Sequence, residues 1–241
     1  MGRNKWRAAE DWPLPGTKFT KYYLHSGGNA NSSSGDGSLG TQPPGDEQAD
    51  RYVYDPDDPT PSPGFTNGHI DGPRDISKTA ARTDVLVYDT SVLTENVELV
   101  GPITARLFAA TSCRDTDWMI RLSDVHPDGK ALFLAEGVMR ARHRDPQRHG
   151  AFNANQLSTI EPNQPYEYAI DFWRPTGNVF ARGHRIRIEI SSSSYPYYLR
   201  NPNTGEDNIA LATKFQAAKQ TIFHDAGRPS HIVLPVIPAG K

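Results

Sequence analysis

The chain reads HRIRIEIS from His184 to Ser191, and this stretch decides the fold. Isoleucine occupies every second position, 186, 188 and 190, and charged side chains fill positions 185, 187 and 189. Successive side chains of a β-strand point to opposite faces, so the pattern predicts a half-buried antiparallel strand with one apolar face and one wet face.

Runs with the same alternation cover residues 103–109, 118–122 and 166–172 and predict further strands. We also expect strands over 132–142, 220–224 and 230–236. Turn-forming sequences separate them, such as Pro127-Asp128-Gly129 and the segment from Asn201 to Gly205. Together these features predict an all-β fold, a jelly-roll β-sandwich with long loops and at most short helices; the best helix candidate is Asp207 to Ala218.

The first third of the chain is less regular. Residues 29–48 are mostly Ser, Gly, Asn, Asp and Pro, and a proline-rich run follows from Asp55 to Gly64. Such segments bury too little apolar surface to fold alone, so we expect long loops ordered by packing on the sandwich. We therefore divide one domain into three segments: residues 1–28 with a first strand, the loops of 29–83, and the main sandwich of 84–241.

Composition excludes several functional classes. A formal net charge of −2 gives no basic field for nucleic acid, and no apolar run is long enough to span a bilayer. The single cysteine, Cys113, lies in an apolar run and is expected to be a buried thiol. We expect a cytoplasmic protein that binds neither nucleic acid nor a membrane.

A serine hydrolase of the α/β type needs a G-x-S-x-G nucleophile elbow, and no serine here has glycine at both of those positions. The nearest imitation is Ser26-Gly27-Gly28. His224 and Asp225 resemble a base and its orienting acid, but adjacent residues of a strand point to opposite faces. We therefore predict no catalytic residue in this chain, and structural or surface roles for both.

Three other groups of side chains could bind something. Asp115, Asp117, Asp124, His126 and Asp128 form the densest set of metal-ligand types, although turn-capping aspartates explain them without a metal, and we predict neither metal nor cofactor. Arg140, Arg142 and Arg144 would share one strand face, as an ion-paired or phosphate-binding trio. Exposed aromatics are the third group, as candidate ligand-facing or domain-interface residues: Trp6, Trp12, Tyr195, Tyr197 and Tyr198.

The ordered motifs resemble the C-terminal domain of the X-Pro dipeptidyl-peptidase group, which includes cocaine esterase and the α-amino acid ester hydrolases. The matching segments are Thr83–Tyr88, Gly101-Pro102, Asp115–Asp117, Leu122–Gly129, Gly137–Arg142, Gly183–Ser193, Asn201–Gly205, His224-Asp225 and Arg228–Pro235. Within them, the positions that match the family motifs and that we expect to be structural are Asp117, Asp124, Asp128, Arg140, His184, Arg185, Asn201 and Asn203.

The resemblance implies a galactose-binding-like jelly roll packed on an α/β-hydrolase domain that carries the serine, histidine and aspartate. This chain would begin where that catalytic domain ends, be inactive alone, support the substrate entrance and contribute to homo-oligomer contacts. The alternatives are a free-standing carbohydrate-binding module that uses the three tyrosines or Trp173, and a metal-dependent enzyme that uses the aspartates and histidines.

Overall fold

The computed structural model describes residues 2, 6, 8–66, 69–70, 73–144, 157–158 and 160–238 of the chain. Their strands are β1 Lys18–His25, β2 Ser38–Gly40, β3 Asp50–Tyr54, β4 Phe65–Thr66, β5 His69–Ile70, β6 Leu86–Asp89, β7 Val97–Gly101, β8 Thr104–Thr111, β9 Asp117–Val125, β10 Ala131–Arg140, β11 Tyr166–Asp171, β12 Thr176–Phe180, β13 Arg185–Ser191, β14 Ala218–Phe223 and β15 His231–Ile237. The described helices are single 3₁₀ turns at Thr79–Ala81, Ala141–His143 and Ile209–Leu211. None of them is long and apolar enough to cross a lipid bilayer.

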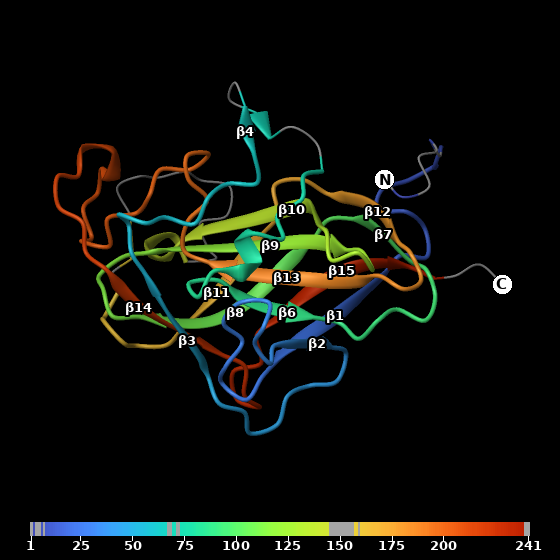
Figure 1. Ribbon diagram of the computed structural model, residues 1–241, viewed down its shortest axis with the longest axis horizontal. Coiled ribbons are helices and arrows are strands. Elements are labelled where there is room, and N and C mark those ends of the chain that lie inside the picture. Colours follow the sequence, from blue (N-terminus) through green and yellow to red (C-terminus); the bar gives the residue numbers. More distant parts are fainter. Residues whose placement is uncertain are drawn as a thin grey trace.

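Two layers of antiparallel strands enclose the core (Figure 1). One layer has the order β10-β9-β13-β6, and β8 and β15 lie at the centre of the other. The layers join through β2 and β1, and a bridge between Gly137 and Phe172 links them again at the β10 edge. The prediction of an all-β sandwich is confirmed.

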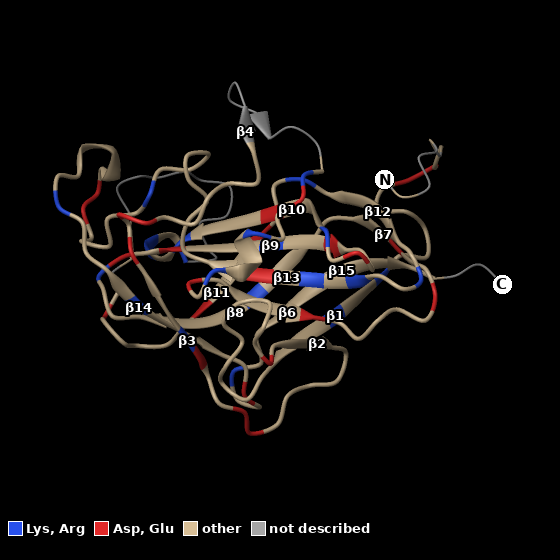
Figure 2. Cartoon of the chain, viewed as in Figure 1, with Lys and Arg blue, Asp and Glu red and all other residues tan. Residues whose placement is uncertain are grey.

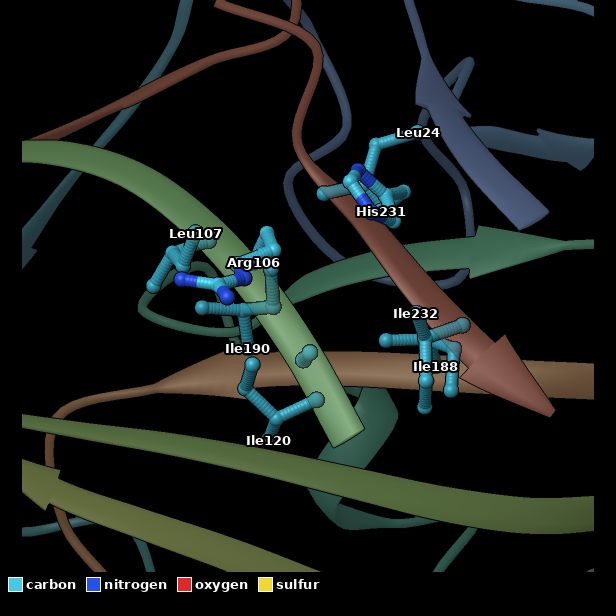
Figure 3. A pocket seen from close by; sticks show the side chains of 9 residues that line it. Leu24, Arg106, Leu107, Ile120, Ile188, Ile190, His231 and Ile232 are labelled. Carbon is cyan, nitrogen blue, oxygen red and sulfur yellow. The ribbon is translucent and has the colours of Figure 1, made fainter. Parts of the chain in front are cut away.

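The core lies where the alternating apolar residues of the two layers meet. Ile120 and Leu122 of β9 and Ile188 of β13 face β8 and β15 across it, and all three are buried. A cavity of about 10 Å³ remains between the layers (Figure 3). It is lined almost wholly by apolar side chains and has room for at most one water molecule, so it is a packing defect and not a ligand site.

The prediction that one face of residues 184–191 is exposed to solvent is wrong. Arg187 and Glu189 are buried, like the isoleucines that alternate with them. They lie on the outer side of β13, where β9 and β10 also carry acidic and basic segments (Figure 2). The segment near Pro61, bridged to Tyr195, covers this side, so the strand is buried on both faces.

Two other predictions of local structure also fail. The strand expected over 132–142 ends at Arg140, so Arg140, Arg142 and Arg144 do not share a strand face. The helix expected over 207–218 is reduced to the 3₁₀ turn at Ile209–Leu211. The backbone of this segment bonds to residues outside it and not within a helix: the Gln216 N–H donates to the Pro202 carbonyl, and the Gln216 carbonyl accepts from the Asn203 side chain.

The loop-rich segment contributes strands that the sequence pattern did not indicate. β3 pairs with β14, and β2 pairs with both β1 and β6. Both strands are short, and their neighbouring residues are polar, so their alternation was too brief to recognise.

Candidate functional site

The predicted aromatic residues do not form one platform. Trp6 is fully exposed and Trp12 is 53% exposed near the N-terminus. Tyr195 is 43% exposed, whereas the rings of Tyr197 and Tyr198 meet edge to face at 83°. A sugar stacks on a flat exposed ring, and the perpendicular pair of tyrosines offers no shared plane.

The described residue that most resembles a nucleophile is Ser26, just after β1. Its Oγ lies 3.2 Å from His224 Nε2, and His224 Nδ1 lies 3.2 Å from Glu47 Oε2. A serine, a histidine and an acid are thus in the order of a catalytic triad. We call Ser26, Glu47, Asp50, Tyr88 and His224 the histidine clamp.

A fourth residue of the clamp, Asp50, prevents this geometry from working as a triad. Its Oδ2 accepts hydrogen bonds from Ser26 Oγ at 2.7 Å, Tyr88 OH at 2.7 Å and His224 Nε2 at 2.8 Å. Its Oδ1 accepts the Ala30 N–H at 2.8 Å. The serine proton therefore points at a carboxylate and not at the imidazole, and Asp50 and His224 are both completely buried.

The charges of the clamp point to the same conclusion. Burial favours the neutral imidazole, but Asp50 and Glu47 outweigh burial and raise the pKa of His224 above its usual value. Burial likewise opposes the charge of Asp50, yet its hydrogen bonds, first that from His224, lower its pKa. A doubly donating imidazolium between two carboxylates cannot accept a proton from serine, so the clamp is a buried ion-pair network and not a catalytic base.

Asp225, the sequence neighbour of His224, belongs to a different interaction. It accepts two hydrogen bonds from the Arg228 guanidinium, the shorter one at 2.6 Å. The two residues are not a pair, as the strand geometry predicts.

A second buried network crosses the outer side of β9, β10 and β13. Arg121 Nε donates to Glu136 Oε2 at 2.7 Å, and the Arg121 Nη2 donates to the Pro61 and Ser193 carbonyls. Burial raises the pKa of the neighbouring Glu189 to about 7 despite the nearby arginines. These charges attach the loop at Pro61 to the sheet.

Four of the family-motif positions meet at the start of β9. The Asn201 Nδ2 donates to Asp117 Oδ1 at 2.9 Å and to Asp115 Oδ2 at 3.3 Å, and Arg140 Nε donates to Asp115 at 2.6 Å. Asn203, with a φ of 63°, continues the turn by donating its side-chain amide to Gln216. Burial raises the pKa of Asp117 to about 7. This cluster shapes the loop after β13.

The other four family-motif positions lie near the opposite end of β9. Asp124 accepts a hydrogen bond from His184 Nδ1 at 2.8 Å. Asp128 caps the β9–β10 turn by accepting the Lys130 N–H, and Arg185 donates to the Thr90 carbonyl. All eight positions therefore take part in hydrogen bonds that organise turns or strand ends. Cys113 is buried, with a free thiol.

Sequence analysis singled out Ser26 and His224 of the histidine clamp but not the two carboxylates that bind them. Glu47 lies in the polar segment before β3 and Asp50 is the first residue of β3, and acidic residues in such a segment are usually exposed on the surface. The usable signal was local: Asp50 directly precedes the apolar alternation of Tyr52 and Tyr54, which places it at a strand end.

Fold and site define an all-β sandwich domain whose buried ionic groups hold loops onto its two layers. Residues 1–233 match the family described as the X-Pro dipeptidyl-peptidase C-terminal non-catalytic domain. The chain belongs to this family.

Three similar proteins are longer than this chain. Cocaine esterase of Rhodococcus sp. (strain MB1 Bresler) is 44% identical over 98% of the chain and 41% of its own length. An α-amino acid ester hydrolase has 30% sequence identity to the chain and a TM-score of 0.82, and the match covers 98% of this chain and 40% of the hydrolase. An aminopeptidase from a marine sediment archaeon, Thaumarchaeota archaeon, has 30% sequence identity to the chain and a TM-score of 0.83, and the match covers 98% of this chain and 39% of the aminopeptidase. The chain thus spans about two fifths of the length of these proteins.

Proposed function

We propose that this domain is the accessory part of a serine hydrolase that cleaves esters or X-Pro peptide bonds. The observation that carries the proposal is the 44% identity to an esterase of which the chain covers 41%. An α/β-hydrolase catalytic domain, in the same polypeptide or a neighbouring subunit, would supply the nucleophile. The domain would support that catalytic domain, help to shape the substrate entrance and contribute to contacts between copies.

Exposed aromatic side chains near the N-terminus support a docking role. Trp6 and Trp12 are exposed, and Phe19 on β1 is 52% exposed. Large apolar side chains gain free energy when a partner covers them, by about 25 cal/mol per Å² of apolar surface. We propose that residues 1–28 lie against the catalytic domain and that the segments 29–83 and 84–241 form the body of the accessory domain.

Ester hydrolysis tests the proposal directly. We expect the isolated chain to give no saturable hydrolysis of p-nitrophenyl acetate, and the longer hydrolase that contains it to be active and inactivated by a serine-directed fluorophosphonate. Saturable activity of the isolated chain that this inhibitor abolishes would overturn the non-catalytic role.

Docking is tested in the longer hydrolase. Trp12→Ala should lower the melting temperature of the whole enzyme, whereas Trp173→Ala, at an 80% exposed tryptophan, is the matched control and should not. Equal effects of the two substitutions would contradict docking through the N-terminal segment.

We also propose a cytoplasmic location; with Cys113 as its single cysteine, the chain has no internal disulfide that would need an oxidising compartment. Fractionation of the source cells tests this proposal.

A further inference from the structure

We propose that Asp124, His126 and His184 form a binding site for Zn²⁺ at one end of the sandwich. We call these three side chains the rim triad. The proposal is independent of the proposed hydrolase function, because none of the hydrolase argument uses this site.

Strand geometry brings the triad together. Leu122, Asp124 and His126 follow one another at every second position, so they lie on one face of β9 and its continuation. Arg185 pairs with Val125 and Ile186 with Asp124, which places His184 beside His126 on the neighbouring strand. The same alternation that buries Leu122 therefore continues into an acid and two imidazoles where the core ends.

The ligand atoms of the three side chains lie close enough together for one metal ion to bind all of them. His184 Nδ1 lies 2.8 Å from Asp124 Oδ1, and His126 Nε2 lies 3.8 Å from Asp124 Oδ2. One ligand atom from each residue falls within 4.8 Å of the other two. Ligands at zinc bond lengths of about 2.0–2.1 Å are separated by about 3.4 Å in a tetrahedron, so the distances in the protein lie on both sides of that value.

The imidazole rings of His126 and His184 lie against each other. Their centroids are 4.3 Å apart with an interplanar angle of 40°. Two cationic rings at that separation would repel, whereas two neutral rings can share one cation. Zn²⁺ binds the unprotonated nitrogen of a neutral imidazole, so metal binding would replace the hydrogen bond between Asp124 and His184 with a bond from each residue to the metal.

Burial anchors one ligand and leaves the others accessible. Asp124 is buried, and its Oδ2 lies 3.5 Å from the buried Asn178 Nδ2, an outer partner that orients the carboxylate. The His126 side chain is 33% exposed, which opens the site to solvent. Three protein ligands with one position open to water is a common arrangement for Zn²⁺.

The donor set selects the class of metal. Two imidazole nitrogens suit Zn²⁺, Ni²⁺ or Cu²⁺, whereas Ca²⁺ and Mg²⁺ prefer an all-oxygen shell. Bound Zn²⁺ would hold the β9–β10 turn against the turn that precedes β13.

Isothermal titration of the untagged, chelator-treated chain with ZnCl₂ tests the site, with the absorption spectrum of the Co²⁺ complex as a second readout. We expect one zinc per chain, a raised melting temperature, and for Co²⁺ the intense visible absorption of a tetrahedral complex, which hexaaqua Co²⁺ lacks. His126→Gln should weaken zinc binding at least tenfold, on the order of the loss seen when a ligand's environment is disturbed.

Asp128→Asn is the matched control, because Asp128 lies in the same turn but its carboxylate hydrogen-bonds to Lys130 and to none of the three rim-triad side chains in the described part of the chain. It should bind zinc like the unmodified chain. His126 is partly exposed, so its variant should fold, and an unchanged metal-free melting temperature checks this. Absence of one-to-one binding, equal binding by the His126→Gln variant, or equal loss in the Asp128→Asn control would each overturn the proposal.

Discussion

Replacing His224 by glutamine should destabilise the domain by about 3 kcal/mol at pH 6, the lower end of the cost of breaking a buried ion pair. His224 is completely buried and donates to Asp50 at 2.8 Å and to Glu47 at 3.2 Å. Glutamine keeps a donor for one carboxylate at most and carries no charge. The variant therefore leaves a buried carboxylate without its cation.

The pH dependence gives the sharper signature. The folded pKa of His224 is raised above the unfolded value, so its stabilisation is complete below about pH 6.5 and is lost as pH rises through the folded pKa. The folded pKa of Asp50 is lowered, so its contribution is present above about pH 4 and is lost as pH falls through the folded value. Between the unfolded and folded pKa values of His224, stability should fall by at most about 1.4 kcal/mol per pH unit.

Urea unfolding of the unmodified chain and of the variant, from pH 5 to pH 9, measures both effects. The variant should lose the decline above pH 6.5. His231→Gln is the control, because His231 contributes a pH dependence of stability opposite in sign to that of His224. Burial lowers the pKa of His231, so the fold favours its neutral form. A His224→Gln cost below about 1 kcal/mol, or a decline above about pH 6.5 that is as steep in the variant as in the unmodified chain, would refute the assignment of an imidazolium to the clamp.

Three further substitutions test other parts of the fold. Asp117→Asn should raise the free energy of unfolding at pH 8 by about 1–3 kcal/mol and remove the loss of stability between about pH 4 and pH 7, because the folded pKa of Asp117 is about 7 and its charged form is disfavoured in the fold. Urea unfolding at pH 5 and pH 8 measures both effects. Gly137→Ala should cost about 1–3 kcal/mol in the same assay, because an added Cβ would lie 2.6 Å from the Phe172 ring. Arg140→Lys should expose the segment near Glu206 to proteolysis, because lysine cannot bond both Asp115 and the Glu206 carbonyl.

The strands of the sandwich could be predicted where alternation was long and apolar. β8, β9, β11 and β13 each carry three or more apolar residues at every second position, and each was located to within a few residues. β2 and β3 escaped because they are short and lie among loop-forming residues. The helix expected over 207–218 failed because hydrogen bonds from outside the segment compete for its backbone.

The candidate sites were less predictable for a different reason. Arg187 and Glu189 were predicted to face solvent because charged residues usually do, but both are buried on the side of the sheet where Arg121 bonds to the loop at Pro61. The histidine clamp combines residues just after β1, before and within β3, within β6 and just after β14, and contacts of such long range leave no pattern in a single sequence. The rim triad was partly visible, since Asp124 and His126 are two residues apart, but His184 joins them only through strand pairing.

The pairing of β1 with β15 has a consequence for how the domain is made. These are the first and last strands of the described chain, and they are hydrogen-bonded from Lys18 to Tyr23. β15 also pairs with β7 and β8, so it lies at the centre of its layer. A ribosome delivers that strand after all its partners, and until then three strand edges are unpaired. Synthesis therefore passes through an interval in which these edges can bind one another or a second nascent chain, and chaperone protection matters most just before the last strand emerges.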